Sequence, residues 1–198
     1  MKRITLALTG ASGMAYGLRL LECLLQVNCK VDLLISQAAR IVAKQELDLS
    51  LPSDNAALAR QLAEKYPGGA LAVYGEKEWF APAASGSNPA DAMVVCPCSM
   101  GSLAAIAHGL ADNLIERAAD VMLKEKRTLI LVPRETPFSL IHLRNMTQLV
   151  ECGAIILPAN PGFYHRPQSI DEVVDFIVAR ILDQLSVPHT LMPRWGES

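Results

Sequence analysis

Small and hydroxyl-bearing residues gather near the start of the sequence, in Thr9-Gly10-Ala11-Ser12-Gly13. This segment leads from a short apolar run into a stretch with helical periodicity. Its glycines permit a tight turn, and a helix N-terminus offers N–H groups and a positive dipole end to a phosphate. The segment therefore predicts a phosphate cradle, the alternative being that Ser12 merely caps the helix. It matches neither the G-x-G-x-x-G of dinucleotide enzymes nor a Walker loop.

Two further groups of hydroxyl residues follow other apolar runs. Ser36 ends one run, and Cys96-Pro97-Cys98-Ser99-Met100-Gly101-Ser102 follows another at the start of a predicted helix. Together with the first turn, these groups would line a polar cofactor that has a flat ring and a phosphate. Each serine alone is more often an N-cap, so this interpretation depends on the three groups meeting.

Charged residues stand in similar places. Arg134 and Glu135 lie between two prolines after a buried run, and Lys124 lies two helical turns beyond Arg117 on roughly the same face. Arg180 interrupts an apolar helical stripe made of Val173, Val174, Ile177 and Ile181. A solvated helix face explains Lys124 readily, whereas it explains Arg180 less well.

These residues must be positioned by apolar runs that alternate with helical stretches. We expect strands at Arg3–Thr9, Lys30–Ile35, Ala92–Cys96, Thr128–Val132 and Ala154–Leu157. We expect helices at Met14–Gln26, Gln37–Glu46, Ser99–Ala107, Asn113–Lys124, Phe138–Glu151 and Ile170–Leu185. Strands that are apolar on both faces and separated by helices predict an α/β three-layer sandwich with a doubly wound parallel sheet, Rossmann-like or flavodoxin-like. In such folds ligands bind outside the carboxyl ends of the strands.

Two segments are the least regular of the chain. They are Leu51–Gly69 and Gly75–Asn88, and the second is rich in proline and small polar residues. We expect the second segment to be a mobile loop.

Composition limits the classes of function. The chain has 198 residues, of which 51% are hydrophobic, and a net charge of −2, which predicts one globular domain over residues 1–198. This charge balance excludes a global basic field for nucleic acid or anionic lipid. The N-terminal apolar run is too short for a signal peptide, and no apolar run reaches the roughly 18–20 residues of a membrane span, so we expect a cytoplasmic protein.

The cysteines predict neither a metal site nor a disulfide framework. Their number is odd, and Cys96-Pro97-Cys98 is C-x-C rather than C-x-x-C, without histidine at ligand spacing. We therefore expect small buried hydrophobic side chains at all five positions, which are Cys23, Cys29, Cys96, Cys98 and Cys152.

From end to end, the chain resembles the UbiX-type flavin prenyltransferases. The matching segments are TGASG with YG shortly after it, the strand-end Ser36, PxASGS from Pro82 to Ser87, CPCS, NLIERAADVxLKE, VPRETPF, PGFYHRPQS and LMPRWGE. The resemblance implies a metal-independent enzyme that transfers a dimethylallyl group from dimethylallyl monophosphate to N5 and C6 of reduced FMN. The product, prenylated FMN, serves UbiD-type decarboxylases, including one in ubiquinone biosynthesis. The resemblance also implies a homododecamer with its sites at subunit junctions.

The resemblance further assigns roles to residues. The FMN-binding positions are matched by Gly10, Ala11, Ser12, Ser36, Ser99, Met100, Gly101, Ser102 and Arg134. The positions around the prenyl phosphate and the prenyl chain are matched by Trp79, Ser85, Arg117, Lys124, Tyr164 and Arg180. Ser12 and Glu46 match a polar pair near flavin N5, and Glu135 matches the residue proposed to protonate the departing phosphate. Met100 stands at a position that varies among relatives.

Elementary chemistry agrees with these roles. Breaking an allylic C–O bond builds positive charge on the prenyl unit and negative charge on the phosphate. Cationic donors are therefore needed at one end and apolar or π walls at the other. The sequence alone leaves open whether Glu135 is protonated and whether a monophosphate or a diphosphate is the donor.

The sequence supports three other functions less well. A flavin-dependent decarboxylase of peptidyl or pantothenoyl cysteine needs a histidine near the ring, and the motif of that family is not matched by His108, His142, His165 or His189. A non-catalytic FMN carrier would not need Lys124, Tyr164 and Arg180. An NAD-dependent dehydrogenase would need an acidic residue after the second strand to bind the ribose, and the sequence places none there.

Overall fold

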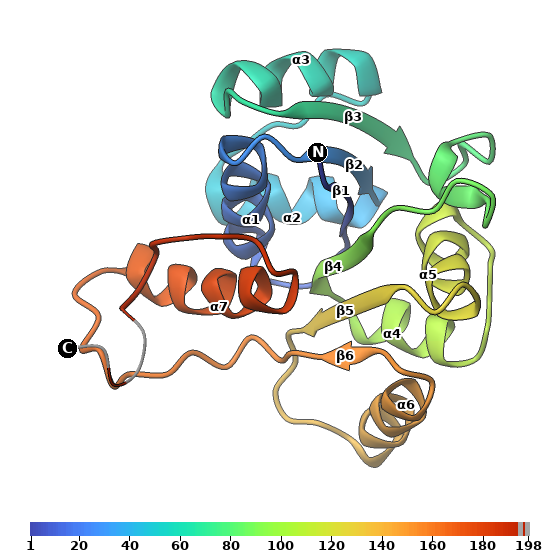
Figure 1. Cartoon of the computed structure of the whole chain (residues 1–198). Helices are drawn as coiled ribbons and strands as arrows, with labels where there is room; N and C mark the ends of the chain where they lie inside the picture. The colour runs from blue at the N-terminus through green and yellow to red at the C-terminus, as the bar shows by residue number, and fades with distance from the viewer. Residues whose placement is uncertain (194–195, 197–198) are drawn as a thin grey trace.

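The computed structural model describes residues 1–193 and 196, and these form a six-stranded parallel sheet of order β3-β2-β1-β4-β5-β6 (Figure 1). The strands are β1 (Arg3–Leu8), β2 (Lys30–Ile35), β3 (Ala70–Gly75), β4 (Ala92–Cys98), β5 (Thr128–Pro133) and β6 (Ile155–Ile156). This order is that of the Rossmann fold rather than the flavodoxin-like one. The closing LMPRWGE segment lies partly outside the described residues, at positions 194, 195 and 197.

Helices cover both faces of the sheet. One face carries α1 (Met14–Gln26), α2 (Gln37–Leu47), α3 (Asn55–Lys65) and α7 (Ile170–Gln184). The other face carries α4 (Met100–Ala107), α5 (Leu114–Lys124) and α6 (Leu140–Glu151). Along β1, Leu6 is buried against the first group of helices and Ala7 against the second, because successive side chains of a strand point to opposite faces. The predicted α/β three-layer sandwich is therefore confirmed.

The sequence missed regular structure in three places. Leu51–Gly69 contains α3, and Gly75–Asn88 contains the 3₁₀ turn η1 (Pro82–Ala84), while β3 lies between these segments. Helix α3 buries only Leu58 and Leu62, so its apolar stripe is too narrow to be evident in the sequence. Strand β3 lies at the edge of the sheet and is mostly half-exposed, so it lacks the continuous apolar run of the inner strands.

The cysteine prediction holds at four positions and is wrong at one. Cys23, Cys29, Cys96 and Cys98 are buried, and burial raises the pKa of Cys23 to about 11 and that of Cys98 to about 12. Cys152 is exposed because it ends α6 at a turn completed by Gly153. Among the described residues no group of histidine, cysteine or acidic side chains is placed to hold a metal ion.

No helix among the described residues is both long and apolar enough to cross a membrane.

Candidate functional site

The strand order reverses between β1 and β4, and a Rossmann sheet opens its ligand crevice at that point. The buried Thr9 ties the two strand ends together. Its hydroxyl donates to the Pro97 carbonyl at 2.8 Å and accepts the Ser99 N–H at 2.8 Å. The turn after β1 and the start of α4 are therefore fixed against each other.

The N-terminus of α1 is closed by a side chain from α2. The Glu46 carboxylate accepts the Gly13 N–H at 3.0 Å and the Met14 N–H at 2.9 Å, and the Ser12 hydroxyl also bonds to it. Gly13 is the N-cap, with φ of 108°, a conformation that glycine adopts without a steric penalty. The interpretation of Ser12 as the cap is therefore wrong. The predicted phosphate cradle must also be corrected. The Gly13 and Met14 N–H groups, which it would offer to a phosphate, already donate to the Glu46 carboxylate.

The environment of Glu46 favours its charged form. Burial raises the pKa of this carboxyl, but the hydrogen bonds from Ser12, Met14 and Gly13 and the charge of Arg134 outweigh burial, so the net pKa is lowered. Glu46 is therefore ionised at neutral pH. The Ser12 hydroxyl thus bonds to Glu46, as the resemblance implies, and Arg134 is near enough for its charge to act on the same carboxylate.

Ser36 and Ser99 both serve as N-caps. Ser36 Oγ accepts the Ala39 N–H at 3.0 Å at the start of α2, and Ser36 is 7% exposed. Ser99 Oγ accepts the Ser102 N–H at 3.2 Å and donates to Ser102 Oγ at 3.0 Å at the start of α4. The capping role is confirmed at both positions. It leaves the Ser36 hydroxyl proton available for donation, since capping uses only the oxygen as an acceptor.

Two glycines of this region differ in the space around them. A Cβ added at Gly10 would lie 2.5 Å from the Ala38 Cβ, so the turn after β1 contacts α2 directly. A Cβ added at Gly101 would meet nothing closer than Ser99 Oγ at 4.0 Å. The backbone of α4 at Gly101 therefore faces open space, next to the buried Met100.

Arg134 and Glu135 follow β5 at the same edge of the sheet. The Arg134 N–H donates to the Cys98 carbonyl at 3.4 Å, and Glu135 Oε1 accepts the Thr136 N–H at 3.1 Å. Arg134 is exposed and Glu135 is half-buried. These two residues and the site residues described above, which follow the carboxyl ends of the strands or contact that region, are named the carboxyl-edge cluster. Its members are Gly10, Ala11, Ser12, Ser36, Glu46, Ser99, Met100, Gly101, Ser102, Arg134 and Glu135.

A second set, the loop–helix cluster, consists of Trp79, Ser85, Arg117 and Lys124. Arg117 Nε donates to the Ala84 carbonyl at 3.0 Å, and Arg117 Nη1 pairs with Asp120 at 2.7 Å. A Cβ added at Gly86 would lie 2.5 Å from Lys124 Nζ, so the loop contacts this ammonium directly. Trp79 is 43% exposed.

Within the loop–helix cluster, Lys124 lies near the amino ends of the strands, whereas the carboxyl-edge cluster lies at their carboxyl ends. Lys124 ends α5, and β5 begins shortly afterwards at Thr128, which pairs with Ala92, the first residue of β4. Arg134 follows the other end of the six-residue β5. At about 3.3 Å per residue, the strand separates these two ends by roughly 20 Å. One chain therefore does not bring Lys124 to the carboxyl-edge cluster.

A third set, the α7 surface, consists of Tyr164 and Arg180. The ring of His165 stacks on that of Phe176 with centroids 5.7 Å apart, and a Cβ added at Gly162 would lie 2.9 Å from the Phe176 ring. Phe176 and Arg180 are four residues apart and so share a face of α7. The loop that carries Tyr164 therefore lies on the helix face of Arg180.

Arg180 requires a correction to the sequence analysis. Its side chain is exposed and pairs with Asp183 at 2.9 Å, while the apolar face of α7 is formed by Val174, Ile177, Val178 and Ile181. Arg180 therefore does not interrupt the buried stripe but lies beside it. In Figure 1, α7 and α5 lie on opposite sides of the molecule, so Arg180 is also remote from Lys124.

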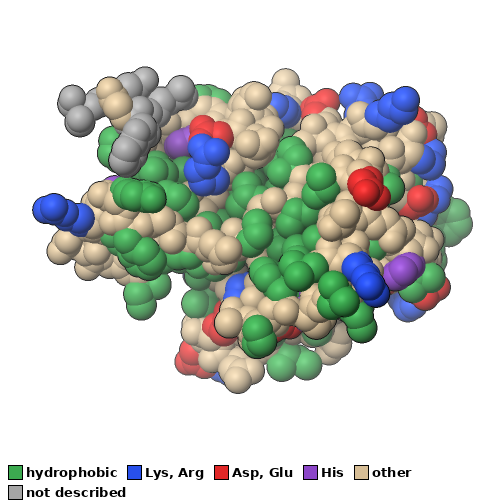
Figure 2. Space-filling model, turned by 90° about the horizontal axis from the view of Figure 1, so that it is seen from below, with side chains coloured by type: hydrophobic (Ala, Val, Ile, Leu, Met, Phe, Trp, Pro, Cys, Tyr) green, Lys and Arg blue, Asp and Glu red, His purple; other side chains and the backbone are tan. Residues whose placement is uncertain are grey.

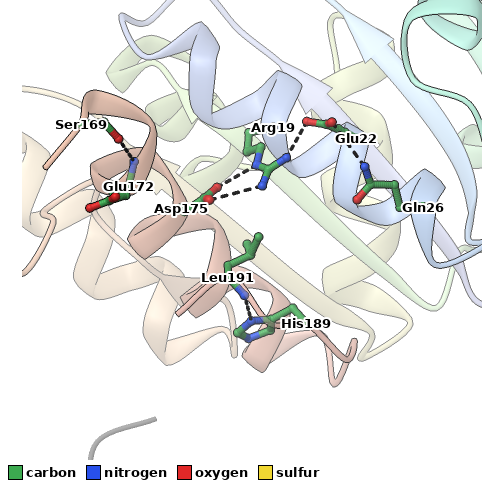
Figure 3. A network of polar contacts seen from close by, with 8 residues as sticks. All are labelled: Arg19, Glu22, Gln26, Ser169, Glu172, Asp175, His189 and Leu191. Carbon is green, nitrogen blue, oxygen red and sulfur yellow. Dashed lines mark hydrogen bonds and ion pairs between the residues drawn. The ribbon is translucent and has the colours of Figure 1, made fainter. Parts of the chain in front are cut away.

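A polar network fixes α7 on α1 (Figure 3). Arg19 Nε pairs with Asp175 at 2.7 Å and Arg19 Nη1 with Glu22 at 2.7 Å, and the bond to Asp175 above all raises the pKa of the guanidinium. His189 accepts the Leu191 N–H at 3.4 Å and also contacts Asp183 at 3.1 Å. The Arg19–Asp175 pair could not be predicted from the sequence, because its partners lie 156 residues apart in the chain.

Comparison with known proteins agrees with this geometry. A family model described as Flavoprotein matches residues 1–182. The chain is 57% identical over 199 residues to the flavin prenyltransferase UbiX of Pseudomonas aeruginosa, covering 99% of this chain and 95% of the relative.

Solved structures show the same likeness. AnUbiX (PadA1), in complex with FMN and dimethylallyl pyrophosphate, matches with a TM-score of 0.89 and 42% identity over 98% of this chain and 97% of its own. A dodecameric FMN-dependent UbiX-like decarboxylase from Escherichia coli O157:H7 matches with a TM-score of 0.86 and 38% identity over 98% of this chain and 99% of its own. The chain therefore belongs to the family of UbiX-type flavin prenyltransferases.

Proposed function

We propose that this protein transfers the dimethylallyl group of dimethylallyl monophosphate to N5 and C6 of reduced FMN and releases prenylated FMN. The observation that carries the proposal is the Glu46 carboxylate at the strand-order reversal, which bonds to Ser12, Gly13 and Met14 and lies in the field of Arg134. Two relatives support the proposal. One is a flavin prenyltransferase to which the chain is 57% identical, and the other is a similar structure that contains FMN and dimethylallyl pyrophosphate.

The carboxyl-edge cluster suits FMN. The open space at Gly101 and the exposed Arg134 leave room for a flat ring and a cation for its phosphate or its negative charge. Ser36 and the Ser99–Ser102 segment offer hydroxyl donors at two helix starts. Reduced FMN, when bound, supplies the nucleophilic N5 and C6.

Within this cluster, Ser12 and Glu46 handle a proton. When the prenyl unit leaves its phosphate for N5, the N5 proton would pass to an ionised carboxylate, and closure at C6 would move the C6 proton to the prenyl double bond. The lowered pKa of Glu46 keeps its oxygens unprotonated, and the Ser12 hydroxyl bonded to them connects them to the reaction site.

The leaving phosphate is stabilised by cations. Lys124, Arg117 and Arg180 offset the charge that develops on it, Tyr164 donates a hydrogen bond, and Glu135 protonates it. The exposed indole of Trp79 and the flavin ring form the apolar walls for the prenyl cation.

Neighbouring copies complete the site in this proposal. The three sets of residues lie on separate parts of one chain, so they meet only if different copies contribute them. Figure 2 shows apolar side chains gathered on the lower face of the molecule. The exposed large apolar side chains of this part of the chain are Leu140, Ile141, Leu143 and Val150 in α6, Phe163 in the loop after β6 and Ile170 at the start of α7. Such a surface favours burial against partners. The dodecameric relative supports a homododecamer.

We also propose the destination of the product. Prenylated FMN from this enzyme serves a UbiD-type decarboxylase, either in ubiquinone biosynthesis or in the decarboxylation of other aromatic acids. The expectation of a cytoplasmic enzyme belongs to this proposal.

The test is an anaerobic incubation of the protein with reduced FMN and dimethylallyl monophosphate, followed by mass spectrometry. The expected product is a flavin heavier by one C5 prenyl unit. A parallel reaction with the diphosphate determines the preferred donor. If FMN binds normally and neither donor gives the product, the proposed transferase is wrong and a cysteine decarboxylase or FMN carrier takes its place.

A further inference from the structure

Arg3 connects the amino ends of two strands to a loop. Its Nε pairs with Asp32 in β2 at 2.6 Å, and its Nη1 donates to Asn88 Oδ1 at 2.8 Å. Its backbone N–H donates to Asp91 Oδ2 at 2.8 Å, and the Asp91 N–H returns to the Arg3 carbonyl at 2.9 Å. A single residue at the start of β1 thus holds both ends of the short segment 88–91.

The Arg3–Asp32 pair is not explained by stability alone. The Asp32 side chain is 1% exposed, and within the described part of the chain Asp32 Oδ1 and Arg3 Nη2 are buried without a hydrogen-bond partner. A buried ion pair with incomplete hydrogen bonding contributes little net stability, and apolar residues of similar volume often serve as well. The pair does orient the guanidinium, so that Nη1 is directed to Asn88.

The loop that Arg3 holds carries part of the loop–helix cluster. The Asn88 N–H donates to the Ser85 carbonyl at 3.3 Å, and the Ser87 N–H donates to Ser85 Oγ at 3.3 Å, so residues 85–88 form one turn. This turn contacts Lys124 through Gly86. The position of Ser85 relative to the Lys124 ammonium therefore depends on how Asn88 is held.

We propose that Arg3, oriented by the buried Asp32, is a positioning residue for binding of the substrate phosphate, acting through Asn88 to hold Ser85 and Gly86 against Lys124. Arg3 touches neither the flavin nor the prenyl group in this role. The inference rests on the proposed function, because that function makes Ser85 and Lys124 ligands of the phosphate.

The test uses the exposed Asn88, whose replacement leaves the buried ion pair in place. In Asn88→Ala we expect the KM for dimethylallyl monophosphate to rise about tenfold, because one charge-assisted hydrogen bond to the loop is lost. We expect kcat to change less than threefold, and the affinity for FMN and the melting temperature to stay as in the wild type. Amide exchange of residues 84–90 is expected to become faster.

Four further variants, including Arg3→Gln alone, refine the test. Asn88→Asp keeps an oxygen acceptor for Arg3 Nη1 and is expected to restore the KM. Gln61→Ala, in α3, removes a side-chain amide that donates to the Ser50 carbonyl in the segment before that helix, and is expected to change neither KM nor kcat. Arg3→Gln combined with Asn88→Ala is expected to have the same KM as Arg3→Gln alone, because Arg3 Nη1 donates to both Oδ1 and the backbone carbonyl of Asn88 and Arg3→Gln already removes both contacts.

The outcomes separate this inference from the proposed function. A wild type that makes no prenylated FMN would contradict the proposed function. The inference is then tested by calorimetry with inorganic phosphate: weaker binding to Asn88→Ala than to the wild type supports it, and equal binding contradicts it. If the wild type is active and Asn88→Ala keeps the wild-type KM, or if Asn88→Asp does not rescue a raised KM, the positioning role of Arg3 is wrong.

Discussion

Glu46 Oε2 accepts the Met14 N–H at 2.9 Å, so a carboxylate carried by α2 caps α1. The same carboxylate bonds to Ser12 and lies in the field of Arg134. One side chain therefore has a structural and a chemical role, and these can be separated because they respond to different measurements.

Replacing Glu46 by Gln tests both roles. Loss of the charge at the helix N-terminus is expected to lower stability by about 1 kcal/mol, and loss of the proton acceptor is expected to slow turnover by at least about 100-fold. Denaturant unfolding and anaerobic turnover measure the two effects. Glu64→Gln, the same change on the exposed side of α3, is the control, and an equal loss of turnover in that variant would argue against a specific role for Glu46.

The lowered pKa of Glu46 predicts a dependence of stability on pH. Because the pKa lies below its ordinary value of 4.5, ionisation of Glu46 stabilises the folded state fully at pH values above 4.5. This contribution is lost as the pH falls through the lower, folded-state pKa. The difference in melting temperature between wild type and Glu46→Gln is therefore expected to be constant near neutral pH and to shrink below 4.5. A difference that stays the same down to acid pH would contradict the assigned ionisation.

Gly10→Ala and Gly101→Ala form a matched pair. The new Cβ at Gly10 would clash with Ala38, so that variant is expected to lose about 1–3 kcal/mol of stability. The new Cβ at Gly101 enters open space within α4, so stability is expected to be kept or raised by up to about 1 kcal/mol. If FMN lies against Gly101, this second variant binds FMN more weakly despite its intact fold. Unchanged FMN affinity in Gly101→Ala would move the ring away from α4.

The Arg19–Asp175 pair predicts a stability effect without a flavin effect. Asp175→Asn removes the counter-charge of a partly buried guanidinium and is expected to cost about 1–2 kcal/mol. FMN affinity is expected to be unchanged, because the pair joins α1 to α7. Asp48→Asn, which breaks the exposed pair with Lys44, is expected to cost less than about 0.5 kcal/mol. Equal losses in both variants would mean that Asp175 is no more than a surface charge.

Glu135→Gln tests the proposed protonation of the phosphate. The amide keeps the shape of the side chain but cannot supply the proton, so the variant is expected to retain FMN and to turn over slowly. Turnover is followed anaerobically, with bound flavin measured by absorbance. Wild-type turnover would remove Glu135 from the mechanism.

The limits of sequence-based prediction are physical. Strands such as β1 and β4 are predictable because burial on both faces gives them continuous apolar runs. The serines that follow them are predicted to lie close together because the carboxyl ends of parallel strands meet at the same end of the sheet. Glu46 was assigned only through the resemblance, since no local pattern shows that a residue near the end of α2 reaches the start of α1. The separation of Lys124 from Arg134 was equally hidden, because it depends on which end of β5 each residue adjoins.

That separation along β5 has a genetic consequence under the proposed assembly. Each copy would give its Lys124 to one reaction centre and its Arg134 to another, so a mutation at one end of the strand disables a centre that belongs partly to a neighbour. Two alleles, one defective at Lys124 and the other at Arg134, could then complement each other when co-expressed. In mixed particles, some centres would receive a sound residue from each parent.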